Sequence, residues 1–262
     1  MQVARIEDRD LLANFLGRQR ALNAYLIGDL DDAQWGKTEY WAISDGEEIQ
    51  EVALLYHGMT PPILITVQNS AGDWMRQLLE KLIAELPNQI YAHLSAGLLD
   101  IVETRFQVED HGPHNIMELT SDDVVRNIDA SDVELLQPRD YDALEALYAA
   151  SYPGHWFRRN MLETGPYVGI RDSSGEIFSA GGAHVYSRRY GVATLSNIVT
   201  LPERRGEGLG RLVSAKLCQI LSGEVDTIGL NVHAQNKAAI HIYESLNFRK
   251  LAEYSEMTLR EF

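Results

Sequence analysis

The segment TLPERRGEGLGRLV, residues 200–213, places three alternating glycines and three arginines between a proline and an apolar run. Glycine has no Cβ atom, so Gly206, Gly208 and Gly210 let a ligand approach the main chain closely. The first turn of a helix offers unpaired N–H groups and a partial positive charge, which suits a phosphate group. We interpret this segment as a phosphate-binding turn that opens a helix.

The arginines of this segment, Arg204, Arg205 and Arg211, favour the same interpretation. A cation at a helix N-terminus costs a few tenths to about 1 kcal/mol unless an anion offsets it, and a pyrophosphate supplies that anion. The alternative is a solvated glycine-rich turn whose arginines point to water. Two other nucleotide-binding motifs do not fit. The Rossmann fingerprint requires a third glycine at the position of Arg211, and the GxxxxGK[ST] phosphate loop of nucleotide hydrolases is absent.

A second constellation lies in NKAAIHIYESLNF, residues 236–248, where Asn236 and Tyr243 are seven residues apart. Seven residues are two helical turns, so both side chains share one helix face. Aminolysis of a thioester needs a neutral amine, donors for the oxyanion and a proton for the departing thiolate. A phenol with a pKa of about 10 can supply that proton at neutral pH. The alternatives are a helix N-cap for Asn236 and a core position for Tyr243.

In these two motifs the chain resembles the GNAT superfamily of acyl-CoA-dependent N-acetyltransferases. The family's phosphate motif, [RQ]-x-x-G-x-[GA] after a strand, is similar to Arg205-Gly206-Glu207-Gly208-Leu209-Gly210, and the preceding Pro202 is also typical. Its second motif is similar to Asn236, Tyr243 and the LNF that ends at Phe248. The resemblance covers about residues 131–262, and LETGPYVGIRDSSG is similar to the branch that includes glycine N-acyltransferase-like proteins.

The resemblance implies acetyl-CoA (coenzyme A) as the acyl donor and no metal. It implies that Tyr243 is the general acid and that Asn236 hydrogen-bonds the donor near its pantetheine arm. The main chain of the strand end would contact the pantetheine arm and the thioester carbonyl, through Ile198, Val199 and Thr200. The pyrophosphate would lie on Arg205, Gly206, Glu207, Gly208, Leu209, Gly210 and Arg211.

The expected function is therefore an N-acetyltransferase that moves an acetyl or short acyl group to a primary amine by direct attack in a ternary complex. The alternative is a non-catalytic acyl-CoA-binding or sensing module. Many relatives carry a Glu on the central strand as the base, but VATLSNIVT (192–200) has no carboxylate. His184, His233 and Tyr186 are candidate bases through water. Cys218 lies too far along the helix to be the nucleophile, and the eight histidines show no HxxxH spacing for a metal.

The elements that must position these residues occur in the same order in both halves of the chain. We predict an α/β chain with two GNAT-like domains in tandem, each a mixed, mostly antiparallel twisted sheet flanked by helices. Residues 1–120 form a degenerate domain, 121–130 a connector and 131–262 the catalytic domain. Helical stretches are predicted over 8–32, and single helices over 72–86, 96–106, 139–151, 156–164, 206–221 and 236–246. The predicted strands are 2–6, 40–44, 47–57, 62–68, 89–95, 115–120, 132–137, 167–172, 176–187, 192–200, 227–233 and 248–260.

The first half lacks the phosphate motif. Its corresponding loop reads VQNSAGDWMRQ, with one glycine and with Asp73 where a phosphate would lie. We expect this half to pack against the second and to shape an acceptor cleft. Trp35, Tyr40 and Trp41 could line that cleft, with core positions as the alternative.

Composition limits the remaining function classes. The 262 residues carry a formal net charge of −15 and a single cysteine, which argues against nucleic-acid binding and excludes an intrachain disulfide. Without a signal peptide or an apolar run of about 18 residues, we expect a cytoplasmic protein that does not bind membranes. The expected partner is a small-molecule or peptide amine, and the chain is expected to be a monomer or a homodimer.

Overall fold

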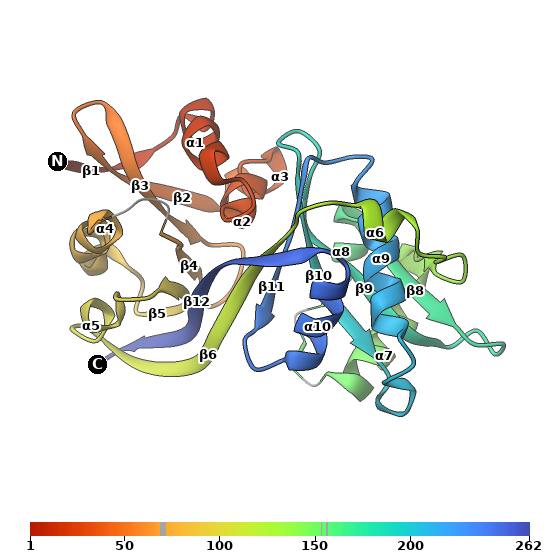
Figure 1. Ribbon diagram of the computed structural model, residues 1–262. Coiled ribbons are helices and arrows are strands. Elements are labelled where there is room, and N and C mark those ends of the chain that lie inside the picture. The colour runs from red at the N-terminus through yellow and green to blue at the C-terminus, as the bar shows by residue number, and fades with distance from the viewer. Residues whose placement is uncertain (69–71, 153, 156) are drawn as a thin grey trace. The chain divides into compact units, whose positions relative to one another are not determined.

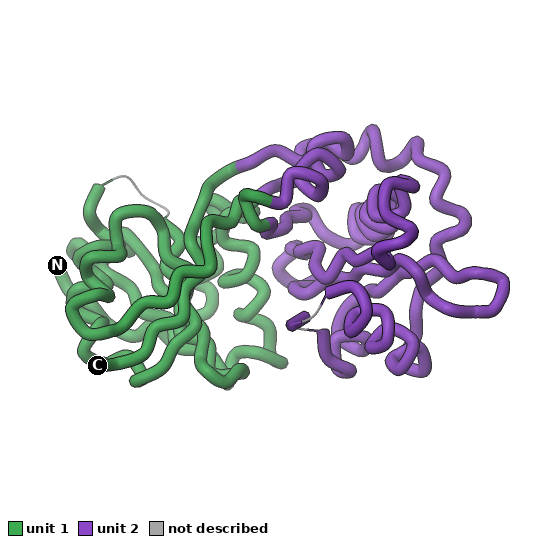
Figure 2. The backbone as a smooth tube through the Cα atoms, turned by 90° about the horizontal axis from the view of Figure 1, so that it is seen from below, with its two compact units in different colours: residues 1–116, 233–235, 251–262 green, residues 117–232, 236–250 purple. Residues whose placement is uncertain are grey.

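The computed structural model describes residues 1–68, 72–152, 154–155 and 157–262, and these form two compact units (Figure 2). Unit 1 comprises residues 1–116, 233–235 and 251–262, and unit 2 comprises residues 117–232 and 236–250. The last residues of the chain, which the sequence analysis places in the second domain, thus fold with unit 1. The reason is strand pairing: Tyr254–Arg260 of β12 (Phe248–Glu261) pair antiparallel with β5 (Gln89–Ser95).

Unit 1 is built on strands in the order β1-β2-β3-β4-β5-β12. Neighbouring strands are antiparallel except β4 and β5, which are parallel and joined through α4. The other strands are β1 (Gln2–Ile6), β2 (Thr38–Asp45), β3 (Glu48–Tyr56), β4 (Ile63–Thr66) and β6 (Phe106–Leu119), the last of which continues into unit 2. The helices are α1 (Arg9–Leu16), α2 (Ala24–Gly28), α3 (Asp32–Trp35), α4 (Trp74–Leu82) and α5 (Leu99–Val102) (Figure 1).

Unit 2 repeats this plan with the strand order β11-β10-β9-β8-β7. Its parallel pair is β10 and β11, joined through α9, and its other pairs are antiparallel. The strands are β7 (Glu134–Leu135), β8 (Tyr167–Arg171), β9 (Ile177–Ser187), β10 (Val192–Thr200) and β11 (Thr227–His233). The helices are α6 (Asp123–Arg126), α7 (Tyr141–Ser151), α8 (Met161–Thr164), α9 (Leu209–Leu221) and α10 (Lys237–Ser245).

The spacing of apolar residues explains how α4 and α9, the helices that join the parallel strands, pack on the sheets. In α4 the apolar side chains at helical spacing, Met75, Leu78, Leu79 and Leu82, are all buried. In α9 the corresponding buried set is Val213, Leu217, Cys218 and Leu221, and this helix lies over β8, β9 and β10 (Figure 1). The mixed, mostly antiparallel architecture predicted from the sequence is confirmed.

The helical stretches predicted over 8–32 are α1, α2 and α3, with a 3-10 turn at Gly17–Gln19 after α1. One helix prediction differs from the structure. The predicted helix 96–106 is reduced to α5, because the chain turns after Val102 and buries Phe106 as the first residue of β6. The start of β6 was missed because its polar residues and Pro113 hide the alternation expected of a strand.

Of the aromatic residues suggested for a cleft in unit 1, Tyr40 is a core residue, whereas Trp35 and Trp41 are half-buried. Tyr40 and Trp41 are neighbours on β2, so their side chains point to opposite faces of the sheet and cannot line one cleft. The Tyr40 hydroxyl donates to the carbonyl of Leu26 at 2.6 Å, and Trp35 stacks on the Tyr40 ring. Among the described residues, no helix is long and apolar enough to cross a membrane.

Candidate active site

The two parallel strands of unit 2 separate before they end. β10 and β11 are paired from Val192 with Thr227 to Leu195 with Leu230. Beyond this point β10 continues to Thr200, paired only with β9 on its other side. Along a strand, the N–H and C=O groups of successive residues point alternately to the two neighbouring strands. Leu201 N–H donates to the Phe178 carbonyl on the β9 side. The main-chain groups of Thr200 and Ile198 therefore point to the other side, toward the edge that β11 leaves. The edge predicted to contact the donor is therefore free of strand pairing.

A bulge at Asn197 shifts the register of β10 just before this edge. Asn197 has φ of 55°, a left-handed conformation that is unusual for a residue other than glycine. Two buried tyrosines hold it: the Tyr148 hydroxyl donates to the Asn197 carbonyl at 2.8 Å, and the Asn197 amide donates to the Tyr167 hydroxyl at 2.9 Å. Burial raises the pKa of Tyr167 to about 12, so both hydroxyls remain neutral and can keep these bonds.

The glycine turn follows directly. Gly206 and Gly208 have φ of 85° and 80°, and a Cβ atom at either position would meet no other residue. The main-chain N–H groups of residues 206–210 donate no hydrogen bond within the part of the chain that the structure describes, whereas Arg211 N–H already donates to the Gly208 carbonyl. Five consecutive donors at the start of α9 are thus available to an anion.

The arginines of the segment differ in what they contact. Arg204 pairs with Glu207 at 2.8 Å and its guanidinium lies 4.1 Å from the centre of the Phe178 ring. Its charge is thereby compensated within the turn, contrary to the expectation that all three arginines require a bound anion. Arg205 donates to the carbonyls of Thr200 and Ser151, at 3.3 and 3.2 Å. These bonds hold its side chain beside the end of β10.

Arg211 lies on the first turn of α9 and is half-buried. Its Nε donates to the hydroxyl of Ser245 on α10 at 3.1 Å. On the same turn, a Cβ atom at Gly210 would lie 3.5 Å from Ile242 of α10 and 3.9 Å from Ile198 of β10. These are ordinary van der Waals distances, so α9, α10 and the free end of β10 lie close together around Gly210.

Asn236 is the N-cap of α10, and its side-chain oxygen accepts a hydrogen bond from Ala239 N–H at 3.1 Å. The capping role considered for it is confirmed. A cap uses only the carbonyl oxygen of the amide, so the –NH₂ group can still donate to a ligand. The structure thus leaves the proposed contact of Asn236 with the donor as a prediction.

Tyr243 lies two turns further along α10, packed edge-on against the Phe248 ring, with ring centres 5.8 Å apart. Its side chain is buried, and burial raises the pKa of its hydroxyl well above the ordinary value. The hydroxyl therefore stays protonated at any physiological pH. Its hydroxyl donates no hydrogen bond to the residues that the structure describes, so its proton is available for transfer.

Cys218 belongs to the same core as Tyr243 and is fully buried on α9. Burial raises the pKa of its thiol to about 12. A thiol that is neutral and enclosed by core residues is not activated as a nucleophile, which agrees with the sequence-based argument against an acyl-enzyme.

Two of the three candidate bases are engaged elsewhere. Tyr186 donates to Glu224, beyond the C-terminus of α9 and thus roughly 20 Å of helix from the glycine turn. His233 accepts from Gln235 N–H at its Nδ1, and its Nε2 contacts the carbonyl of His111. Both nitrogens of His233 are used, in unit 1. His184 is exposed on β9 and stays a candidate.

The equivalent region of unit 1 is closed. There β4 and β5 remain paired to the end of β4, at Thr66 with Leu94. Gln68 N–H then donates to the Ser95 hydroxyl at 2.9 Å, which continues the link between the two segments. The glycine-poor loop lies partly at residues 69–71, outside the described residues, and Asp73 occupies the N-cap of α4. Up to Gln68, unit 1 therefore has no free strand edge like that of β10, and the sequence of the loop that follows lacks the alternating glycines.

The sequence did not indicate three residues of this site, Tyr148, Tyr167 and Asn197. No local signal marks them, since their contacts join positions 30 and 49 residues apart in the chain. Asn197 was visible only as a polar residue inside an apolar strand, which is a weak indication of a bulge.

Comparison with known proteins agrees with this geometry. Residues 167–257 match the family described as FR47-like protein. Solved structures similar to this chain include an acetyltransferase from the GNAT family of Colwellia psychrerythraea, at 12% identity with 100% of each chain covered and a TM-score of 0.56. A GCN5-related N-acetyltransferase from Sphaerobacter thermophilus is 12% identical over 98% of this chain and 94% of that one, with a TM-score of 0.59.

A tandem GNAT protein from the clavulanic acid biosynthesis pathway is similar over 98% of this chain and 97% of that one, at 14% identity and a TM-score of 0.54. This chain therefore has the GNAT N-acetyltransferase fold in its tandem form, and the family resemblance seen in the sequence is confirmed. The relation to glycine N-acyltransferase-like proteins stays a prediction.

Proposed function

We propose that unit 2 binds acetyl-CoA, or another short acyl-CoA, and transfers its acyl group to a primary amine. The observation that carries this proposal is the run of five amides at residues 206–210 that have no partner among the described residues, next to a strand edge that β11 leaves unpaired. Amides at a helix N-terminus suit a pyrophosphate, and an exposed strand edge suits the amide groups of a pantetheine arm.

The proposed reaction is a direct attack in a ternary complex. The neutral amine attacks the thioester carbonyl, a C–N bond forms and the C–S bond breaks. The departing thiolate takes the proton of the Tyr243 hydroxyl, and the nitrogen loses one proton to the solvent or a base. Main-chain N–H at the free edge of β10, at Ile198 and Thr200, would donate to the developing oxyanion.

The remaining proposed contacts are those of the donor. Arg205 and Arg211 flank the glycine turn and place positive charge beside the pyrophosphate. Asn236 offers its –NH₂ group near the pantetheine arm. The acidic chain favours a cationic small-molecule or peptide amine as acceptor, and a single free cysteine agrees with the cytoplasm as the location. We assign acyl-CoA binding to unit 2 alone, because β4 and β5 of unit 1 stay paired up to Thr66 and the sequence of the following loop lacks the alternating glycines.

A second candidate, a non-catalytic acyl-CoA-binding module, is favoured by one observation. β10 carries no carboxylate, and His233 and Tyr186 are engaged elsewhere, so no base of unit 2 is evident along the strand. This candidate predicts binding of acyl-CoA without turnover.

Thermal unfolding with acetyl-CoA, followed by a thiol-release assay with a panel of primary amines, tests both candidates. A ligand at 100 times its Kd stabilises the folded state by about 2.7 kcal/mol, so we expect a rise in Tm of several degrees and steady CoA release with at least one amine. Stabilisation without thiol release would support the non-catalytic module. If acetyl-CoA neither stabilises the protein nor is consumed with release of thiol, acyl-CoA binding is refuted.

The bulge at Asn197 gives a prediction for the positioning of the donor. Tyr148→Phe removes the hydroxyl that donates to the Asn197 carbonyl and leaves that acceptor unpaired, which costs roughly 1–3 kcal/mol of stability. We expect kcat to fall about tenfold, while the Kd for acetyl-CoA changes little, because the glycine turn is intact.

Tyr141→Phe is the matched control for this variant. Tyr141 lies on the same helix, α7, and stacks on the same Phe157 ring as Tyr148 does, but its hydroxyl makes no hydrogen bond within the described residues. Equal kcat values for the two variants, measured below both Tm values, would rule out a positioning role for Tyr148.

A further inference from the structure

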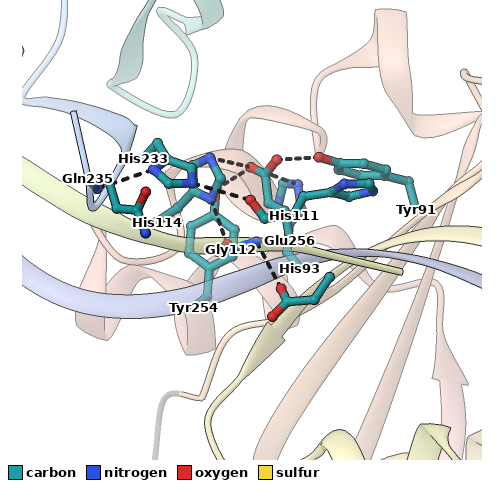
Figure 3. A network of polar contacts seen from close by, with 10 residues as sticks. Tyr91, His93, His111, Gly112, His114, His233, Gln235, Tyr254 and Glu256 are labelled. Atoms are coloured by element: carbon teal, nitrogen blue, oxygen red, sulfur yellow. Dashed lines mark hydrogen bonds and ion pairs between the residues drawn. The ribbon is translucent and has the colours of Figure 1, made fainter. Parts of the chain in front are cut away.

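The short segment that leads from β11 into α10 is shaped by the side chain of His233, the last residue of β11 (Figure 3). The Nδ1 atom of His233 accepts a hydrogen bond from Gln235 N–H at 3.1 Å. A side chain that accepts from the N–H two residues further on closes a tight turn, as Asn and Asp side chains do in an Asx turn. Asn236, the N-cap of α10, follows directly. The direction in which the chain enters α10 is therefore set at His233.

The ring of His233 is also held at its other nitrogen. Nε2 lies 3.2 Å from the carbonyl of His111 on β6, a group that can only accept, so Nε2 carries the hydrogen and Nδ1 keeps its lone pair for the turn. One residue further on, Ala234 N–H donates to the Pro113 carbonyl at 2.8 Å. The His114 ring lies edge-on to the His233 ring, with centres 4.9 Å apart. These contacts lie within unit 1 and keep the ring from turning away from the turn.

Gly112 leaves the space that the His233 ring needs. It has φ of 93°, and a Cβ atom at this position would lie 2.8 Å from His233 Nε2. A side chain at residue 112 would therefore push the ring aside or distort the main chain of β6. The bonds of His233 depend on a glycine at this position.

The first turn of α10 depends on the residue that follows the turn at His233. The side-chain oxygen of Asn236 accepts from Ala239 N–H at 3.1 Å, and its carbonyl accepts from Ile240 N–H at 3.0 Å. The orientation of Asn236 that makes both bonds also decides where its –NH₂ group, proposed above to contact the donor, points. Tyr243 is two turns further on and is held by its own packing against Phe248.

We propose that His233 is a positioning residue for acyl-CoA binding: its hydrogen bond with Gln235 N–H aims the Asn236 amide at the donor. The inference rests on the proposed function of unit 2, and it gives His233 a different role from the general base considered in the sequence. Because the bond acts on the main chain before α10 and not on Tyr243, its loss weakens donor binding and leaves the chemical step unchanged.

The wild type, His233→Leu and His233→Asn are compared to test this role. Leucine accepts no hydrogen bond, whereas the asparagine oxygen can accept from Gln235 N–H in an Asx turn. We expect His233→Leu to raise the Kd and the KM for acetyl-CoA about three- to tenfold, roughly the contribution of one hydrogen bond, with kcat nearly unchanged. His233→Asn should return both constants to near the wild-type values. Calorimetry gives the Kd, and thiol release gives KM and kcat.

Hydrogen exchange gives a second measurement that needs no acyl-CoA. The Ala239 and Ile240 amides should exchange faster in His233→Leu than in the wild type or in His233→Asn, because the cap of α10 is then formed less of the time. Equal exchange in all three proteins would overturn the positioning role. Equal Kd values in the wild type and His233→Leu would do the same, as would a His233→Asn variant that binds as weakly as His233→Leu.

Failure of the proposed function has a different result. A wild type that acetyl-CoA does not stabilise would refute acyl-CoA binding and this role with it, before any variant is compared. Failure of the positioning role alone leaves a wild type that binds acetyl-CoA as well as His233→Leu does.

Gly112→Ala is the second variant if His233→Leu does not fold. Its methyl group would displace His233 Nε2 while β11 and α10 keep their sequence, so we expect a similar rise in the Kd for acetyl-CoA. Gly97→Ala is the matched control: Gly97 is also in unit 1, has φ of 82° and has open space around a Cβ atom. It introduces backbone strain without displacing the His233 ring. Equal Kd values in the two glycine variants would overturn the proposal.

Discussion

Alanine at both positions 206 and 208 is expected to abolish measurable acyl-CoA binding while unit 2 remains folded. Both glycines have positive φ, and a Cβ atom at either would point into open space rather than into the protein. The substitution therefore costs only backbone strain, roughly 1–2 kcal/mol for each residue. If the pyrophosphate lies on this turn, as proposed, two added methyl groups would crowd it, so we expect the Kd for acetyl-CoA to rise at least about a hundredfold.

Gly175→Ala is the control for strain alone. Gly175 lies in the β8–β9 hairpin of the same unit, has φ of 91° and also has open space around a Cβ atom. We expect it to lower Tm by a similar amount per residue and to leave the Kd for acetyl-CoA unchanged. Binding is measured by calorimetry below the Tm of each variant. Unchanged affinity in the double variant would show that the phosphate groups do not lie on this turn.

The elements around the glycine turn could be predicted because their signals are local. Gly206 and Gly208 mark the turn, the apolar spacing in residues 209–221 marks α9, and Asn236 marks the start of α10, so each signal lies in or next to the element it marks. Side-chain pairing was less predictable. Arg204 was expected to need a bound anion, but it pairs with Glu207, three residues away, and stacks on Phe178. Sequence spacing allowed that pair but did not require it.

The parts that could not be predicted depend on contacts between distant residues. The C-terminal strand folds with unit 1 because its register matches β5, some 165 residues earlier in the chain, as the bond between Tyr91 and Glu256 shows. The hydrogen bonds of Tyr148 and Tyr167 to Asn197 likewise join residues that are far apart in the sequence. Each residue is an ordinary strand or helix position in the sequence, and only the strand order brings its partners together.

Tyr243→Phe removes the proposed proton donor and is expected to lower kcat by about 10²- to 10⁴-fold, the usual contribution of general acid catalysis. The ring packing on Phe248 is retained, so the Kd for acetyl-CoA and the Tm should change little. Because burial raises the pKa of the hydroxyl above its ordinary value, the wild-type rate should not decline through loss of this proton below about pH 10. Single-turnover kinetics with a reactive amine from the panel measure the chemical step.

Cys218→Ala tests whether the thiol in the same core, rather than the Tyr243 hydroxyl, takes part in the chemistry. Cys218 and Tyr243 are both buried in unit 2, and the thiol raises the pKa of the tyrosine further, after the larger effect of burial. If Tyr243 supplies the proton, Cys218→Ala keeps kcat within a few-fold of the wild type and only lowers Tm through the cavity it leaves. A fully active Tyr243→Phe would exclude the tyrosine as the acid, and an inactive but folded Cys218→Ala would instead favour an acyl-enzyme. The two variants together therefore decide between direct transfer to the amine and a covalent intermediate.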